Sequence, residues 1–285
     1  MDFPVLEMSF PLFFIAGTGL GAVHFGEHST FVSMKLFGLI GYPLVHSFSQ
    51  AYFTRKFEEL RLHDHRYQNF PIERLEDFPK LLSTETDLHG LNVTIPYKEL
   101  IIPYLDVLSH DVEVIGAVNT ICFESAGLVG YNTDWIGFKQ SLTPSLGLWS
   151  KLPSALILGT GGSAKAVGYA LIQLNIPYLM VSRKRRATGL TYEELTDDII
   201  ADSLLIINTT PVGMSPKTET APVLNYQAIT PRHLLFDLIY NPAQTLFLRK
   251  GQEHGAQVKN GLEMLQYQAE ASWALWQSNL EGFSY

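Results

Sequence analysis

The sequence predicts an α/β protein with two domains, and three observations support this prediction. The chain has 285 residues, which is long for a single hydrophobic core. From residue 35 onward short apolar runs alternate with helical patterns, and strands that alternate with helices form mainly parallel sheets. Near residue 153 a second series of buried strands begins, and its first strand is followed directly by a glycine-rich loop.

Composition and charge limit the possible classes of function. Hydrophobic residues make up 46% of the chain and charged residues 17%, which is typical of soluble globular proteins. The net charge of −8 gives no general attraction to nucleic acid or to anionic membranes, so an anionic ligand needs a local basic cluster. The single Cys122 excludes an intrachain disulfide and fits a reducing compartment. We therefore expect a cytoplasmic protein with no nucleic-acid or membrane partner.

No metal site is predicted. His63 and His65 lie two residues apart, but no further ligands follow at metal spacing, so we interpret them as surface residues.

The first 34 residues contain no Lys or Arg. A secretory signal has a basic start and an unbroken apolar core, whereas three glycines interrupt the apolar run 10–23. We expect residues 1–33 to be an appended segment outside the fold, with weak membrane attachment as the alternative.

In the first half, apolar runs predict strands and amphipathic patterns predict the helices between them. Helices are expected from about residue 50 to Leu60 and over 75–82. The strands are expected at 35–40, 65–70, 90–94, after residue 115, and at 127–131, where a turn at 125–126 returns the chain.

Ser47 and Ser49 follow the first predicted strand and lie in the loop before the first helix. Hydroxyl groups and free N–H groups at a helix start can receive an anion such as a carboxylate. The alternative is that one serine only caps the helix.

Lys98 follows a strand end in which Asn92 and Thr94 share one face. Pro96 suits the first position of a helix, so the pattern predicts Lys98 in a first helical turn. The helix macrodipole disfavours a cation there by roughly 0.3–1 kcal/mol, which favours loss of the proton from the lysine. The alternative is a solvated surface lysine. Asp134 similarly marks the start of a helix at the domain junction, where an N-cap is the alternative to a functional carboxylate.

The strand predicted at 155–158 leads into a small-residue loop and then an apolar helix to about Leu174. Glycines there allow a tight turn and close approach of a pyrophosphate to the helix N-terminus. A second strand at 178–181 stands at the expected distance. We therefore predict dinucleotide binding by Gly159, Gly161, Gly162, Ser163 and Ala164.

That second strand ends in basic residues where an NAD-binding protein usually carries an acidic one. Basic side chains at this place suit the 2′-phosphate of NADP, and a solvated turn is the alternative. The residues expected to contact the cofactor here are Ser182, Arg183, Lys184 and Arg186. Further strands are predicted at 204–207, 234–237 and 257–259, with a helix at 244–254 and a closing helix in which Gln268 faces a cleft.

The order of several motifs is similar to that in shikimate dehydrogenases, the family that reduces 3-dehydroshikimate with NADPH in aromatic amino-acid and chorismate biosynthesis. The resemblance runs from Met34 to the C-terminus. Its motifs are GYPLVHSFS (41–49), NVTIPYK (92–98), GAVNT (116–120), GYNTD (130–134), the loop at Gly159, NTTPVGM (208–214) and DLIYNP (237–242).

The resemblance implies a role for each matching residue. Lys98 and Asp134 would form the catalytic pair, in which Lys98 exchanges a proton with the substrate oxygen. Ser47 and Ser49 would hold the substrate carboxylate, with Tyr240 nearby. The ring hydroxyls would be bound by Asn92, Thr94, Asn119, Asp134 and Gln268. Thr209 and Gly261 would join the residues that bind NADP.

The resemblance also implies a cleft between a substrate domain (34–133 plus 262–285) and a Rossmann-type NADP domain (134–261), in a monomer or homodimer. The sequence departs from common family patterns at Lys165-Ala166, at Ser182-Arg183-Lys184 and at Glu263, which leaves the strength of cofactor discrimination open. Two alternatives are a quinate/shikimate dehydrogenase of broader specificity and a non-catalytic regulator that binds the same metabolites.

Overall fold

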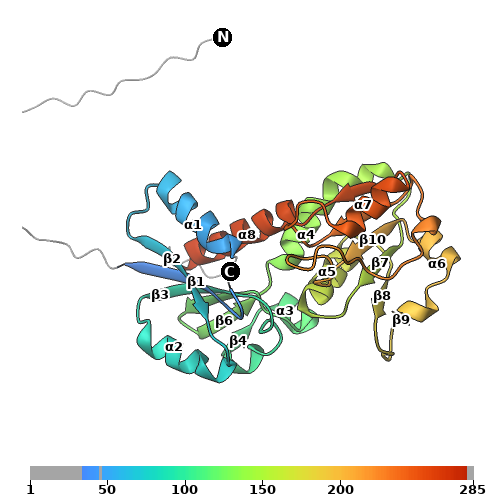
Figure 1. Ribbon diagram of the computed structural model, residues 1–285. Helices are drawn as coiled ribbons and strands as arrows, with labels where there is room; N and C mark the ends of the chain where they lie inside the picture. The colour runs from blue at the N-terminus through green and yellow to red at the C-terminus, as the bar shows by residue number, and fades with distance from the viewer. Residues whose placement is uncertain (1–33, 45–46, 281–285) are drawn as a thin grey trace, which may run out of the picture. The chain divides into compact units, whose positions relative to one another are not determined.

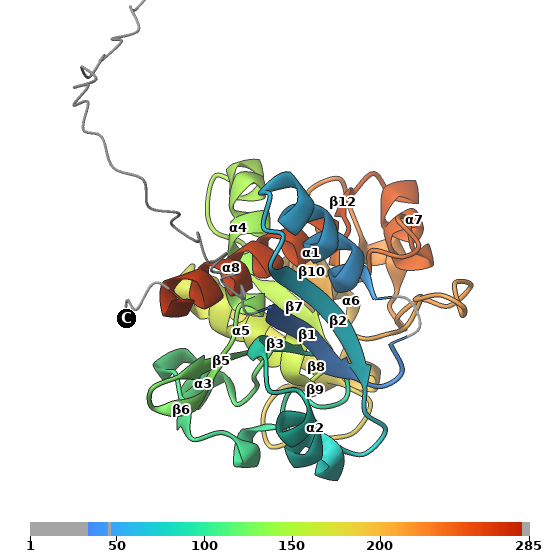
Figure 2. The same ribbon diagram turned by 90° about the vertical axis from the view of Figure 1, so that its left-hand side faces the viewer.

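The structure is a computed structural model that describes residues 34–44 and 47–280, so the expectation for residues 1–33 lies outside the described residues. It contains two six-stranded sheets with helices packed on their faces (Figure 1, Figure 2). The predicted α/β class is therefore confirmed.

The first sheet has the strand order β2-β1-β3-β5-β6-β4. β1 pairs in parallel with β2 and β3, whereas β5 runs antiparallel to both β3 and β6. The hairpin predicted around residues 125–126 is the β5–β6 pair. The strands are β1 (Lys35–Gly41), β2 (His65–Pro71), β3 (Leu88–Val93), β4 (Val107–Leu108), β5 (Thr120–Glu124) and β6 (Gly127–Tyr131).

The second sheet is entirely parallel, with the order β12-β11-β10-β7-β8-β9. The direction of strand addition reverses between β7 and β10, and ligands of such sheets bind at the carboxyl ends of the strands near this point. The strands are β7 (Ala155–Leu158), β8 (Tyr178–Ser182), β9 (Leu190–Thr191), β10 (Leu205–Asn208), β11 (Leu234–Asp237) and β12 (Gln257–Lys259).

The helices cover both faces of each sheet. In the described part of the chain, no helix combines the length and apolar character needed to span a bilayer. The helices are α1 (Phe48–Glu59), α2 (Phe78–Thr84), α3 (His110–Ile115), α4 (Asp134–Leu142), α5 (Gly162–Gln173), α6 (Asp197–Asp202), α7 (Leu246–Glu253) and α8 (Leu262–Leu280).

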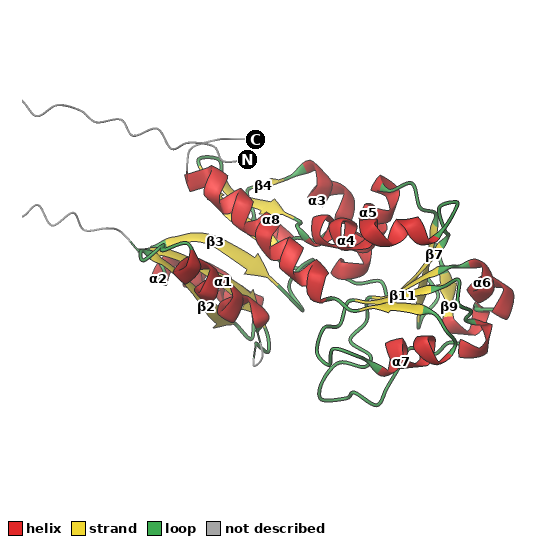
Figure 3. Ribbon diagram, turned by 90° about the horizontal axis from the view of Figure 1, so that it is seen from above, coloured by secondary structure: helices red, strands yellow, loops and turns green. Residues whose placement is uncertain are grey.

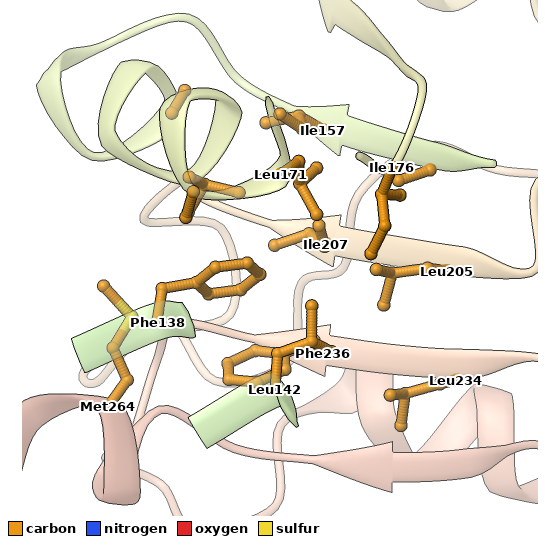
Figure 4. Packing of buried hydrophobic residues seen from close by; sticks show 14 residues of the cluster. Phe138, Leu142, Ile157, Leu171, Ile176, Leu205, Ile207, Leu234, Phe236 and Met264 are labelled. Atoms are coloured by element: carbon orange, nitrogen blue, oxygen red, sulfur yellow. The ribbon is translucent and has the colours of Figure 1, made fainter. Parts of the chain in front are cut away.

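Helix α8 takes part in the cores of both sheets. Near its start Met264 packs with Phe138 of α4 and Phe236 of β11 (Figure 4). About three turns further on, Trp273 and Trp276 pack against the first sheet. Figure 3 shows α8 extending from one sheet to the other beside α4. These two helices therefore connect the two halves of the protein.

The predicted helix after Pro96 is wrong, and residues 94–101 form successive turns instead. The Tyr97 N–H donates to the Thr94 carbonyl and the Ile101 N–H to the Tyr97 carbonyl, both at 2.9 Å, but no continuous ladder of helical hydrogen bonds forms. The helix predicted at 75–82 is also divided, into a 3₁₀ turn (Leu75–Asp77) followed by α2.

Candidate active site

Lys98 lies in the turn that follows β3, so a helix macrodipole does not act on it as the sequence had suggested. The turn is attached to the sheet at its backbone. The Thr94 N–H donates to the Ile40 carbonyl at 2.9 Å, and the Lys98 carbonyl accepts from the Val118 N–H at 2.7 Å. These bonds direct the Lys98 side chain toward the beginning of α4.

The Lys98 ammonium donates to Asp134 Oδ2 at 2.5 Å, and the two side chains are only 15% and 7% exposed. Asp134 is the first residue of α4, where the helix dipole favours a carboxylate. Its other oxygen, Oδ1, accepts from the Asn119 amide at 3.0 Å. A shielded ammonium held by one carboxylate can exchange a proton with a bound substrate, because its position and charge partner are fixed.

A network of buried polar side chains surrounds this pair. The Asn119 side-chain amide also donates to Gln268 Oε1 at 3.2 Å and to Thr133 Oγ1 at 2.9 Å. Asn92 donates to Ser272 Oγ at 3.0 Å, and Ser272 in turn lies 3.0 Å from Thr133 Oγ1. Three predicted ligands of the ring hydroxyls, Asn92, Asn119 and Gln268, thus belong to one hydrogen-bonded cluster.

Several members of this network, among them Thr133, Ser272 and Tyr67, were missed by the sequence reasoning. Ser272 stands one helical turn after Gln268, so the i, i+4 spacing on α8 was an available signal. Tyr67 on β2 donates to Asn92 Oδ1 at 2.8 Å. Strands β2 and β3 pair with opposite edges of β1, and only this arrangement of the sheet brings Tyr67 and Asn92 together. Burial is the main cause that raises the pKa of the Tyr67 hydroxyl, which therefore stays protonated.

The two serines do not occupy equivalent positions. Ser47 precedes α1 at the N-cap position, but its side chain makes no capping hydrogen bond. Its Oγ is one of two buried side-chain polar atoms without a partner among the described residues, the other being Asn69 Oδ1, for which we find no structural explanation. Ser49 lies inside the first turn of α1 rather than in the predicted loop, and its side chain is half-buried there.

Tyr240 and Thr94 lie close to these groups. The Tyr240 ring packs against Phe48 with 5.9 Å between ring centroids, and burial raises the pKa of Tyr240. Tyr240, from the loop after β11 of the second sheet, thus lies beside the helix start that carries the serines. Thr94 lies at the end of β3, and a Cβ at Gly41 would come within 2.4 Å of its methyl group.

The glycine-rich loop connects β7 to α5 as the sequence predicted. Gly159 has a φ of +122°, a conformation that favours glycine, and a Cβ there would lie 2.5 Å from Thr209 Oγ1. Apart from the neighbours of Gly161 in the chain, no atom of the described residues lies within 4 Å of its Cβ position, so the loop faces open space. The N–H groups at the start of α5 can accept an anion there. These features fit a dinucleotide pyrophosphate.

The remaining loop residues pack inward. Ala164, in the first turn of α5, is buried, and Ser163 is half-buried. A Cβ at Gly162 would lie 3.2 Å from the Cβ of Lys98, so the loop lies directly against the catalytic candidate. Gly261 is buried, and a Cβ there would come within 2.0 Å of the Leu238 carbonyl oxygen. The close backbone contact explains the need for glycine at position 261 without invoking a cofactor.

The basic cluster follows β8, at the carboxyl edge of the second sheet. All four basic side chains, residues 183–186, are exposed. Arg185 forms an ion pair with Glu194, and the Ser182 hydroxyl donates to the Lys184 carbonyl at 2.5 Å. Among the described residues no ion pair involves Arg183, Lys184 or Arg186, so these three can receive an external phosphate.

A cavity of about 470 Å³ lies elsewhere, before the amino ends of β7, β10 and β11. Its lining includes Trp149, Arg232 and His233, and both ring nitrogens of His233 already have partners within the protein. None of the predicted site residues lines this cavity.

Comparison with known proteins gives consistent matches. Residues 39–121 match the family described as "Shikimate dehydrogenase substrate binding domain". The shikimate dehydrogenase (NADP(+)) of Desulforamulus reducens is 36% identical over 263 residues, which cover 84% of this chain and 88% of that protein.

Solved structures match over a similar range. The shikimate 5-dehydrogenase of Thermus thermophilus, in complex with NADP(H) and shikimate, is 30% identical with a TM-score of 0.76, covering 86% of this chain and 94% of that one. The quinate dehydrogenase of Corynebacterium glutamicum, in complex with NAD, is 27% identical with a TM-score of 0.75 and the same coverage. The fold is thus shared by enzymes named for either substrate.

Proposed function

The chain belongs to the shikimate dehydrogenase family, and from this premise we propose that it catalyses the reversible NADPH-dependent reduction of 3-dehydroshikimate to shikimate. The observation that carries the proposal is the Lys98–Asp134 pair at 2.5 Å, which lies directly against the glycine-rich loop. A proton-exchanging group next to a dinucleotide site suits the reduction of a ketone, which needs a hydride and a proton.

NADPH would supply the hydride. The loop 159–164 and the start of α5 would receive its pyrophosphate, because N–H groups and open space meet there. Arg183, with Lys184 or Arg186, would bind the 2′-phosphate through charge-assisted hydrogen bonds. Thr209, beside Gly159, would contact the cofactor from β10. We do not extend this role to Gly261, since its packing against Leu238 accounts for it.

The substrate would lie between the serines and the polar network. The unpartnered Ser47 hydroxyl, with Ser49 and Tyr240, would bind its carboxylate. Its ring hydroxyls would bond to Asn92, Asn119 and Gln268, which already belong to the network around Asp134, and to Thr94 at the end of β3.

In the reductive direction Lys98 would donate the proton to the ketone oxygen, and in the oxidative direction it would accept it. Asp134 would orient the ammonium and stabilise its charged form. Asn119 holds Asp134 from the other side, so the carboxylate cannot turn away from Lys98 without losing a hydrogen bond.

We further propose a substrate domain built from residues 34–133 with α8 and an NADP domain built from residues 134–261. Because α4 and α8 connect them, closure about these two helices would exclude water during hydride transfer. We expect a cytoplasmic enzyme that is a monomer or a homodimer.

The test is a spectrophotometric assay at 340 nm with shikimate or quinate, each offered with NADP⁺ or NAD⁺. We expect the highest kcat/KM with shikimate and NADP⁺. Comparable turnover of quinate would identify an enzyme of broader specificity, and binding of both ligands without any turnover would identify a non-catalytic regulator.

The cofactor assignment is tested with Arg183→Ala in the same assay. We expect kcat/KM for NADP(H) to fall about tenfold more than for NAD(H), since each charge-assisted contact contributes about 1.5–3 kcal/mol. An equal loss with both cofactors would identify the basic cluster as a solvated turn.

A further inference from the structure

Lys165 and Glu99 form an ion pair between the two halves of the protein. The Lys165 ammonium, in the first turn of α5, lies 2.5 Å from Glu99 Oε2 in the turn that carries Lys98. Helix α5 packs on the second sheet, whereas residues 94–101 extend from β3 of the first sheet. The pair thus joins the helix of the glycine-rich loop to the segment next to the proton-exchanging lysine.

The Lys98 turn has few other attachments on this side. Its backbone is bonded to the first sheet through Thr94 and Lys98, and the Tyr97 hydroxyl donates to the Ile72 carbonyl at 2.7 Å. Leu100 is 57% exposed. Toward α5, Gly162 packs on Lys98 and Lys165 pairs with Glu99. Because the turn lacks a continuous ladder of helical hydrogen bonds, a polar contact at Glu99 restricts its conformation.

The Glu99 carboxylate also compensates for the unfavourable position of Lys165 at the start of α5. A cation in the first turn of a helix is disfavoured by the macrodipole, whereas an anion there is favoured. Glu99 supplies the anion from outside α5 and offsets the unfavourable position of Lys165. The side chains are 34% and 41% exposed, so the pair adds little to global stability. Its contribution is to the geometry around Lys98, on which proton transfer depends steeply.

We propose that the Lys165–Glu99 ion pair fixes the position of the Lys98 turn relative to the glycine-rich loop, which makes Glu99 and Lys165 positioning residues for proton exchange at Lys98. This inference rests on the proposed function, because this relative position matters only if Lys98 acts next to a bound dinucleotide.

The first test is independent of activity. Hydrogen–deuterium exchange, followed by mass spectrometry on peptides covering residues 94–101, compares the wild type with Glu99→Gln and Lys165→Met. We expect faster exchange in this segment in both variants and no change in peptides from β7 or β10. Unchanged exchange in the 94–101 segment would overturn the proposal even if the enzyme proved to have another substrate.

The second test is a double-mutant cycle in the 340 nm assay. We expect Glu99→Gln and Lys165→Met each to lower kcat about three- to tenfold, with the double variant no slower than the slower single variant. KM for NADP⁺ should change less than kcat in Glu99→Gln. Additive losses would show that the two residues act independently and would overturn the proposal. A raised KM for NADP⁺ in Lys165→Met, with Glu99→Gln unaffected, would show that Lys165 acts only as a phosphate ligand.

Conservative variants and a matched control complete the design. Lys165→Arg keeps a cation that reaches Glu99 and should retain kcat, whereas Glu99→Asp is one methylene shorter and should not. Glu59→Gln removes the comparable Arg55–Glu59 pair at 2.7 Å within α1 and should leave kcat unchanged. Absence of any wild-type turnover would refute the proposed function, while the exchange experiment would still decide whether the ion pair restrains the turn.

Discussion

Lys98 and Asp134 each have their position set by the other. The ammonium is 2.5 Å from one carboxylate oxygen, and Asn119 occupies the second oxygen. We predict that Lys98→Ala and Asp134→Asn each lower kcat by about 10²–10⁴, the range for a positioned acid or base. The double variant should be scarcely slower than either single variant if the two residues act as one unit. Steady-state kinetics would measure this, with circular dichroism to verify folding. Near wild-type turnover in Lys98→Ala would remove Lys98 from the mechanism.

The two serines give different predictions because their surroundings differ. Ser47 Oγ has no partner within the described residues. Ser47→Ala should therefore raise KM for shikimate by a factor that corresponds to about 1–3 kcal/mol of binding free energy, while the melting temperature is kept. Ser49 is half-buried inside the first turn of α1, so Ser49→Ala removes packing as well as a hydroxyl group and should affect both KM and stability. Kinetics and thermal melts of the two variants provide the check. A destabilised Ser47→Ala protein with normal KM would identify Ser47 as a helix cap.

At the scale of elements, two glycines separate a packing requirement from a binding requirement. Gly161 precedes α5 with φ −81° and no neighbour at its Cβ position, so Gly161→Ala should fold normally but weaken NADPH binding by steric conflict. Gly261 lies between β12 and α8, and Gly261→Ala would place a Cβ 2.0 Å from a backbone oxygen. This variant should lose at least about 1–3 kcal/mol of stability. Chemical denaturation and NADPH titration distinguish them, and normal stability of Gly261→Ala would contradict the packing argument.

Asp237 at the end of β11 links three elements through its carboxylate. It accepts hydrogen bonds from Thr245 before α7 at 2.6 Å and from Asn208 of β10 at 3.0 Å. Burial outweighs these bonds and raises the pKa of Asp237 to about 6. Because the folded pKa lies above the unfolded value of 3.8, this carboxyl contributes stability that is complete below pH 3.8 and lost as the pH rises through about 6.

The Asp237→Asn variant cannot ionise and should lack this loss. Its stability relative to the wild type should therefore increase between pH 4 and 7, by up to about 3 kcal/mol if the amide keeps the same partners. Denaturation curves across this pH range would measure the difference, with the exposed Asp202→Asn as the control. A stability difference that is independent of pH would mean that Asp237 is ionised in both states.

At the scale of the whole molecule, both sheets and all matching motifs lie after residue 33. A protein that begins at Met34 should therefore keep the kcat, KM and melting temperature of the full chain. Parallel assays of the two lengths would test this, and a large rise in KM or fall in melting temperature would show that residues 1–33 contribute to the fold or the site.

The strands and the glycine-rich loop were predictable because each is encoded by neighbouring residues. β11 and β12 have the predicted limits, and the loop from β7 to α5 follows directly from its glycines. The segment after Pro96 was not predictable in the same way. Its proline and polar residues suit a helix start. The backbone hydrogen bonds of Thr94 and Lys98 to the first sheet instead hold the segment in successive turns. Long-range hydrogen bonds here outweigh local propensity.

By itself, the sequence determined the α/β class, the positions of most strands, the dinucleotide loop and the family, because periodicity, glycine spacing and motif order are properties of residues close together in the chain. Only the tertiary structure decided which side chains meet. It joins Tyr67 to Asn92 across β1 and brings Lys165 to Glu99, and it gives the 2.5 Å contact between Lys98 and Asp134, a pair that the family resemblance had implied. Such contacts depend on how strands pair and helices pack, which local periodicity does not encode.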